Sequence, residues 1–151
     1  MTCHGARVVW EPREIKHSDP SYSRAHHWEF DGGVRVQASA SPQRVRVPLS
    51  MEAAVDPEEA FVAAIASCHM LWFLDFAQRA QLEVARYCDD ASGTMARDEG
   101  GRWAFREVVL RPMIAWAGRT PSRAELEALH HQSHEACFLA NSVRCEVRVV
   151  F

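Results

Sequence analysis

Apolar and polar residues alternate over the first third of the chain, a pattern typical of half-buried β-strands. The alternation covers residues 22–30 and 33–39, and the Asp31-Gly32-Gly33 turn between these stretches predicts a β-hairpin. A third short strand is expected at residues 44–48, because Pro48 stands at its end, where a strand tolerates proline.

The pattern changes at Asp56, where the sequence predicts the start of a long helix. Asp56 suits the N-cap, Pro57 the first helical position, and Glu58 and Glu59 the positive end of the helix dipole. The residues that follow, as far as Ala80, are apolar on nearly every side. We expect such a helix to be buried all round, either in the centre of the fold or in a subunit interface.

The second half of the chain predicts a hairpin, a helix and a last strand. Alternation over residues 82–96 and 103–116, with a glycine turn between them, predicts the hairpin. Ser122 and Glu125 form a capping-box pattern that opens the second helix. Valines and a cysteine on one side of residues 143–149 predict a half-buried strand. The expected order, ββ(β)-α-ββ-α-β, defines an α+β fold of antiparallel hairpins and two helices.

Composition and charge exclude several classes of protein. The 151 residues are 48% hydrophobic and 25% charged, close to globular averages, so a disordered chain is excluded. The net charge is −3 and no basic stripe is present, so we expect no nucleic-acid partner. The N-terminus lacks the pattern of a signal peptide. The apolar stretch 60–77 contains Ser67, His69 and Asp75, and we expect no membrane span and a cytoplasmic location.

The chain has five cysteines, an odd number, and no CxxC motif. This count argues against a disulfide-stapled secreted protein, so each cysteine is either a small buried hydrophobe or a reactive thiol. Cys68 lies in the first predicted helix and Cys137 near the end of the second. If both point inward, they can meet where the helices pack and form a reversible disulfide.

The histidines of the second helix allow a different interpretation. His130 and His134 have the i, i+4 spacing of zinc ligands, and Cys137 follows about one turn later. The position after the first histidine holds His131, whereas the zinc protease motif HExxH has glutamate there. A metal site therefore stands as an alternative to a plain solvated helix face.

Two segments carry the cysteines: residues 56–69 read DPEEAFVAAIASCH, and residues 134–142 read HEACFLANS. Together they resemble the OsmC/Ohr family of osmotically inducible and organic hydroperoxide resistance proteins. The first segment is similar to the family's helix start ahead of its peroxidatic cysteine, and the second is similar to the segment around its second cysteine. The resemblance covers about residues 20–151, interpreted as one OsmC-like domain, and leaves residues 1–19 as an N-terminal extension of unknown role.

The resemblance implies a cysteine-based peroxidase with four catalytic residues. Cys68 is the peroxidatic cysteine and Cys137 the resolving one. Arg24, with Arg35 as the alternative match, lowers the thiol pKa from its usual value of about 8.5, and Glu58 holds the arginine in place. The enzyme needs no bound cofactor, because an external dithiol, in this family often of the lipoyl type, reduces the disulfide.

The resemblance also implies a homodimer, in which the two long helices are wrapped by sheets from both chains. Large apolar residues near the two cysteines favour an organic hydroperoxide as substrate; they are Met70, Leu71, Trp72 and Phe138. A protein of the same fold that binds a small apolar ligand or senses redox state, without catalysis, is the other candidate function.

Overall fold

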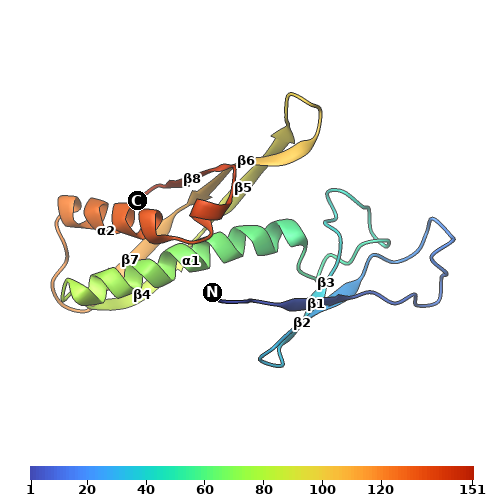
Figure 1. Ribbon diagram of the computed structural model, residues 1–151, viewed down its shortest axis with the longest axis horizontal. Coiled ribbons are helices and arrows are strands. Elements are labelled where there is room, and N and C mark those ends of the chain that lie inside the picture. Colours follow the sequence, from blue (N-terminus) through green and yellow to red (C-terminus); the bar gives the residue numbers. More distant parts are fainter. The chain divides into compact units, whose positions relative to one another are not determined.

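The computed structural model describes all 151 residues, and they form two compact units, Met1–Ala60 and Phe61–Phe151. The elements are two α-helices, one short 3-10 helix and eight strands, most of them antiparallel (Figure 1). The predicted α+β class and the order of the two helices along the chain are confirmed.

The N-terminal unit contains a three-stranded antiparallel sheet in the order β1-β2-β3. These strands are β1 (Ala6–Val9), β2 (His26–Phe30) and β3 (Arg35–Ala38). The predicted hairpin is β2-β3, whereas β1 lies within residues 1–19, for which no element was expected.

The strand predicted at residues 44–48 is wrong, because the chain forms turns there. The Arg44 N–H donates to the Ser41 carbonyl at 2.9 Å, and the Leu49 N–H to the Arg46 carbonyl at 3.0 Å. These local bonds use backbone groups that a strand would offer to a neighbouring strand.

Helix α1 (Pro57–Arg79) begins where the sequence predicts, and its cap is reciprocal. The Glu59 N–H donates to Asp56 Oδ1 at 2.7 Å, and the Asp56 N–H donates to Glu59 Oε2 at 3.1 Å. Each side chain thus satisfies a backbone donor of the other residue, as in a capping box.

Burial along α1 differs from the expected all-round burial. The fully buried residues form one stripe at a spacing of four, Ile65, His69, Phe73 and Ala77. Other sides of the helix are half-buried or exposed, and Leu71 is 61% exposed. Within a single chain, therefore, only one face of α1 is fully covered by the rest of the protein.

By length and composition alone, α1 can cross a membrane. It has 23 residues, and its most apolar window has a mean hydropathy of 1.6, with 22% of that window buried. Length and mean hydropathy therefore do not support the expectation that this stretch contains no membrane span. The core helix of a soluble protein meets the same criteria.

Two small sheets form the β-structure of the C-terminal unit. Strands β4 (Val84–Asp89) and β7 (Pro112–Trp116) pair antiparallel. Strand β6 (Trp103–Leu110) pairs antiparallel with β5 (Ser92–Arg97) and parallel with β8 (Glu146–Val149). The parallel pair is a departure from the expected antiparallel arrangement.

Each long strand predicted in this unit is divided into two strands that belong to different sheets. The first division falls between β4 and β5, and the second falls at Arg111 between β6 and β7. The Arg111 N–H donates to Asp89 Oδ1 at 2.6 Å, and Pro112 that follows has no N–H to donate. The two divisions therefore lie against each other, and the chain changes sheet at both.

The core of the C-terminal unit consists of two apolar clusters along α1. Ile65, Val108 and Leu110 form the cluster against the β5-β6-β8 sheet. Phe73, Ala77, Leu82 and Leu129 form the other, against the β4-β7 sheet and helix α2 (Arg123–Ala136). His69 lies between Ile65 and Phe73 on the same stripe, so a polar residue separates the clusters.

Gly93 on β5 allows a close approach within the first cluster. A Cβ atom at this position would lie 2.5 Å from Phe105 Cε1 and 2.8 Å from Val62 Cγ2. The Phe105 ring cannot move away freely, because it stacks on Phe61 with ring centroids 4.6 Å apart.

We expect Gly93→Ala to lower the free energy of unfolding by about 1–3 kcal/mol, as overpacking of a core does. The measurement is urea denaturation at neutral pH. Gly32→Ala is the matched control, since a Cβ there meets no atom within 4 Å. Equal stabilities of the two variants would contradict the close packing at Gly93.

Candidate functional site

Helix α1 carries Cys68, which is half-buried, and the residue that follows it, His69, lies on the buried stripe. Cys68 is therefore held at the edge of the buried face rather than in its centre. Its neighbour His69 anchors this part of the helix in the core.

Helix α2 begins with the predicted capping box and ends at Cys137. The Glu125 N–H donates to Ser122 Oγ at 3.3 Å, and the Ser122 N–H donates to Glu125 Oε2 at 2.7 Å. Cys137 is the C-cap residue with an extended backbone, and its N–H donates to the His134 carbonyl at 3.2 Å. The thiol is fully buried.

The residues after Cys137 fasten the turn in which it lies. The Asn141 side-chain amide donates to the Glu135 carbonyl at 2.9 Å, and Ser142 Oγ donates to the Phe138 carbonyl at 2.6 Å. The Ala140 N–H points to Cys137 Sγ at 3.4 Å. The Asn-Ser pair of the second motif thus holds the 3-10 turn η1 (Ala140–Ser142) beneath the thiol.

The structure brings Cys68 and Cys137 together from the two helices. Both are free thiols, and the two side chains are near enough for Cys68 to act on the protonation of Cys137. The pKa of the Cys137 thiol is raised to about 11, chiefly by burial and also by the neighbouring Cys68, although the N–H groups of Ala140 and Leu139 act in the opposite direction. Cys137 therefore stays protonated at neutral pH.

A second contact between the helices joins two buried histidines. His69 Nε2 and His130 Nδ1 are 3.1 Å apart, and the side chains are 1% and 2% exposed. The rings are nearly parallel, at 8°, and Phe73 and Phe151 pack against His130. His130 is thus a core residue rather than part of a solvated helix face.

Each histidine of this pair also has one ring nitrogen without a partner, His69 Nδ1 and His130 Nε2. A neutral imidazole carries one N–H and one lone pair. Whichever ring donates the shared bond, one buried donor and one buried acceptor stay unsatisfied. Burial lowers the pKa of His69 to about 4, helped by His134, and that of His130 to about 3, helped by His69.

The alternative metal site at His130, His134 and Cys137 gains no geometric support. His130 Nδ1 faces His69, and Cys137 Sγ accepts a hydrogen bond from the Ala140 N–H at 3.4 Å. No group of three or more His, Cys, Asp or Glu side chains is arranged to hold a metal ion.

Arg24 lies in the N-terminal unit just before β2. Its Nη1 donates to the carbonyls of Pro20, at 3.1 Å, and Tyr22, and its guanidinium covers the Tyr22 ring at 3.8 Å. The side chain forms no ion pair with a carboxylate. The expected bond to Glu58 is not present in this chain: Glu58 is half-buried in the first turn of α1 and forms no ion pair.

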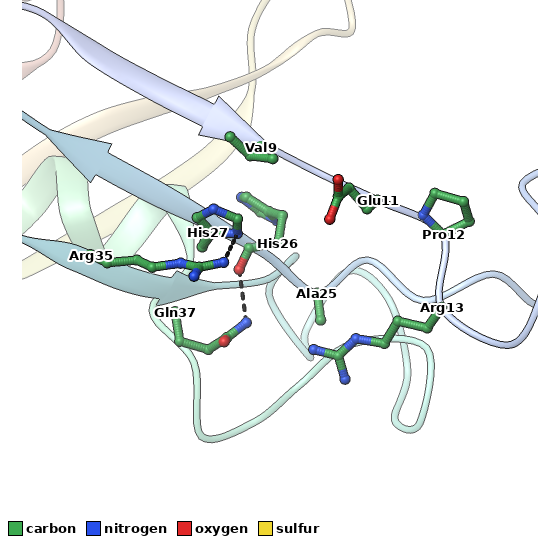
Figure 2. A pocket seen from close by; sticks show the side chains of 9 residues that line it. All are labelled: Val9, Glu11, Pro12, Arg13, Ala25, His26, His27, Arg35 and Gln37. Carbon is green, nitrogen blue, oxygen red and sulfur yellow. Dashed lines mark hydrogen bonds between the residues drawn. The ribbon is translucent and has the colours of Figure 1, made fainter.

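Arg35, the alternative to Arg24, lines a pocket of the same N-terminal unit (Figure 2). This pocket, of about 190 Å³, lies over the β1-β2-β3 sheet, and Arg35 Nη2 donates to His27 Nδ1 at 2.9 Å. His27 Nε2 in turn contacts Glu29 Oε1 at 3.0 Å. Arg35 is therefore engaged in a polar cross-strand network, whereas Arg24 lies among aromatic rings.

Two of the four apolar residues expected to contact substrate, Trp72 and Phe138, pack on each other, and Phe138 directly follows Cys137. Trp72 packs edge-to-face on Phe138 with ring centroids 5.4 Å apart, and Phe138 is 68% exposed. Leu71 is also exposed, and Met70 is half-buried on α1.

Sequence reasoning missed the histidine pair, and one signal for it was present. His69 lies at i+4 from Ile65 and i−4 from Phe73, which places it on the buried stripe of a helix. Its partner, 61 residues away, was not evident from any local pattern.

Comparison with known proteins places the chain in a family. The family model for OsmC-like proteins matches residues 50–151, and the chain belongs to this family. A solved OsmC-like protein of unknown function from Vibrio cholerae is 49% identical, with a TM-score of 0.96 and 99% of each chain covered. No curated protein matches the sequence significantly.

Two more distant solved structures share the fold. One is an organic hydroperoxide resistance protein from Legionella pneumophila, with 18% identity, a TM-score of 0.70 and 100% of this chain and 98% of that chain covered. The other is the organic hydroperoxide resistance protein OhrB of Bacillus subtilis, with 19% identity, a TM-score of 0.65 and 96% of each chain covered. The N-terminal residues 1–19 fall almost wholly within these matched spans.

We expect the buried histidine pair to make folding stability depend on pH. Both folded-state pKa values lie below the usual 6.5, so unfolding takes up protons once the pH falls below about 6.5. Stability is retained above that pH and is lost as the pH falls toward 4, by about 2.7 kcal/mol per pH unit for two protons. Urea denaturation between pH 7.5 and 5 measures this slope.

The double variant His69→Leu/His130→Leu should lose most of the slope. The single variant His69→Leu should be less stable at pH 7.5 by about 1–3 kcal/mol, because it leaves His130 Nδ1 unpaired in the core. His131→Leu, an exposed histidine on the same helix, is the control. A slope in the double variant equal to that of the wild type would show that other groups cause it.

Proposed function

We propose that this chain is a thiol peroxidase that reduces organic hydroperoxides to alcohols. The observation that carries the proposal is the pair of reduced thiols, Cys68 and Cys137, held within reach of each other by two helices. Membership of the OsmC-like family supports it, as do relatives of the same fold that are organic hydroperoxide resistance proteins.

In the first step the Cys68 thiolate attacks the terminal oxygen of the hydroperoxide. A sulfur–oxygen bond forms and the O–O bond breaks, so the substrate leaves as an alkoxide that takes up a proton to become the alcohol. Cys68 suits this step because it is only half-buried, whereas Cys137 is fully buried. Arg24 and Glu58 are the residues that we assign to activation of the thiolate, on their match to the family motif.

In the second step Cys137 resolves the sulfenic acid on Cys68. The sulfur–sulfur bond forms, the sulfur–oxygen bond breaks, and the thiol proton of Cys137 leaves with the hydroxide as water. The raised pKa of Cys137 keeps this proton in place until the step occurs. A protonated thiol is a poor nucleophile, so Cys137 does not compete with Cys68 for the peroxide.

An external dithiol then completes the cycle. It reduces the Cys68–Cys137 disulfide by two thiol–disulfide exchanges and is itself oxidised to a disulfide. A lipoyl-type dithiol fits this role, and the scheme uses no bound cofactor.

We also propose that the chain works as a homodimer. The support is the apolar surface of α1 that the single chain leaves uncovered, including Leu71, which is exposed. A soluble protein rarely leaves so long an apolar helix open to water, and a second copy of the same helix is a suitable cover.

Dithiol-coupled reduction of cumene hydroperoxide tests the peroxidase. We expect Cys68→Ser to lower kcat/KM by at least about a thousandfold, since it removes the nucleophile. Cys145→Ser, at a half-buried cysteine near the last strand, is the matched control and should keep the wild-type rate. Equal rates for wild type and Cys68→Ser would exclude the mechanism and leave a binding or sensing role.

Peptide mapping after one equivalent of hydroperoxide should find Cys68 linked to Cys137, with Cys3, Cys88 and Cys145 free. In Cys137→Ser the sulfenic acid on Cys68 should persist and be trapped by dimedone. A disulfide that involves any of the other three cysteines would contradict the assignment of the pair.

Sedimentation velocity tests the dimer. We expect the mass of two chains for the wild type, and Leu71→Asp should move the protein toward one chain, because a buried unpaired carboxylate is costly. Val34→Asp introduces the same charge at an exposed apolar position in the β2-β3 turn and should leave the mass unchanged. A stable wild-type monomer would refute the dimer.

A further inference from the structure

The two buried histidines take no part in the proposed chemistry, yet each belongs to a helix that holds one of the proposed catalytic cysteines. His69 follows Cys68 directly on α1, and His130 lies about two turns before Cys137 on α2. All four residues belong to the C-terminal unit, Phe61–Phe151. The histidine pair therefore joins the same two helices that the disulfide of the proposed mechanism would join.

Stability of the core does not explain why two histidines occupy this place. The rings share one hydrogen bond at 3.1 Å, but His69 Nδ1 and His130 Nε2 are buried without a partner. A buried polar atom without a partner is destabilising, whereas apolar groups of similar shape in place of both partners can be neutral or stabilising. The pair lies between two apolar clusters, where apolar side chains would suit the surroundings.

The feature that the pair supplies is a fixed register between α1 and α2. A slide of one helix by one residue moves it about 1.5 Å, which is enough to break a hydrogen bond between two side chains. The His130 ring has little freedom to follow such a slide, because its centroid is 4.5 Å from that of Phe73 and 4.3 Å from that of Phe151. Apolar contacts have no required direction and survive the same slide by repacking.

Only one step of the proposed mechanism needs this precision. A disulfide requires Cβ atoms about 3.5–4.5 Å apart, and a misplacement of about 1 Å can slow a reaction about a hundredfold. Attack on the hydroperoxide makes no such demand on the helices, because the hydroperoxide comes from solution and adjusts to Cys68. A shift of α2 against α1 should therefore slow the resolving step and spare the first.

We propose that His69 and His130 are positioning residues for the resolving step, and that their hydrogen bond holds Cys137 where it closes on the sulfenic acid of Cys68. The inference rests on the proposed peroxidase function. When closure is slow, a second hydroperoxide oxidises the sulfenic acid: its terminal oxygen is transferred to the sulfur, which becomes a sulfinic acid, and it leaves as the alcohol. The pair thus favours the reversible disulfide over irreversible oxidation.

Rapid-quench measurements with cumene hydroperoxide at pH 7.5 separate the two steps. Loss of the Cys68 thiol reports the first step, and appearance of the Cys68–Cys137 disulfide reports the second. In His130→Leu we expect the first rate constant to stay at the wild-type value and the closure rate to fall at least about tenfold. The fraction of Cys68 recovered as sulfinic acid, measured by mass spectrometry, should rise accordingly.

Three further variants separate positioning from general damage. The double variant His69→Leu/His130→Leu leaves no polar atom of the pair unpaired, so it should be as stable as the wild type at pH 7.5 and still close slowly. His130→Asn keeps a polar atom at the δ position and should close faster than His130→Leu. Gly93→Ala, expected to destabilise the same unit away from the pair, should close at the wild-type rate.

Wild-type closure in both His130→Leu and the double variant overturns the inference while the peroxidase stands. Equal slowing in Gly93→Ala also overturns it, because lost stability would then explain the effect.

A redox buffer of reduced and oxidised dithiothreitol tests the pair without peroxide. Exchange with the oxidised form makes the Cys68–Cys137 disulfide and releases the reduced form, so the equilibrium constant reports how well the thiols are placed. We expect His130→Leu to lower this constant at least about tenfold. If the wild type does not react with hydroperoxide, the proposed function fails and this measurement still decides the inference. An unchanged constant, or no such disulfide in the wild type, overturns it.

Discussion

The contact between His69 and His130 is the constraint on which the rest of the C-terminal unit depends. The two rings are buried between apolar clusters, and each is the other's only hydrogen-bonding partner. Apolar side chains pack in many registers, but a buried polar pair tolerates only the register in which its atoms meet. Cys68 precedes His69 directly, and Cys137 lies about two turns after His130, so one hydrogen bond sets the position of both thiols.

The two cysteines differ in environment, and the difference supports the separate roles that we propose for them. Cys137 is fully buried and keeps its proton, because desolvation outweighs the N–H groups directed at its sulfur. Cys68 lies at the edge of the buried face, where a substrate can reach it. The asymmetry comes from position on the helices: Cys68 lies within a helix, whereas Cys137 closes one and is enclosed by the turn that follows.

The long helix α1 carries more apolar surface than a single chain covers. Its buried stripe accounts for one face, whereas Leu71 is 61% exposed. Exposed apolar surface of this kind is usually retained for contact with another molecule. We infer a second copy of the chain as the cover for this helix, as in the proposed homodimer.

The sequence by itself determined the features that depend on neighbouring residues. Both helix starts were predictable because a cap joins residues three apart, as in Asp56 with Glu59 and Ser122 with Glu125. The two hairpin turns, the two helices and the motifs around the cysteines were predictable for the same reason. Only the tertiary structure decided the parallel β6–β8 pair, the division of the strands at Arg111 and the partner of His69. These depend on residues far apart in the chain, and alternation along a strand is the same whichever neighbour it pairs with.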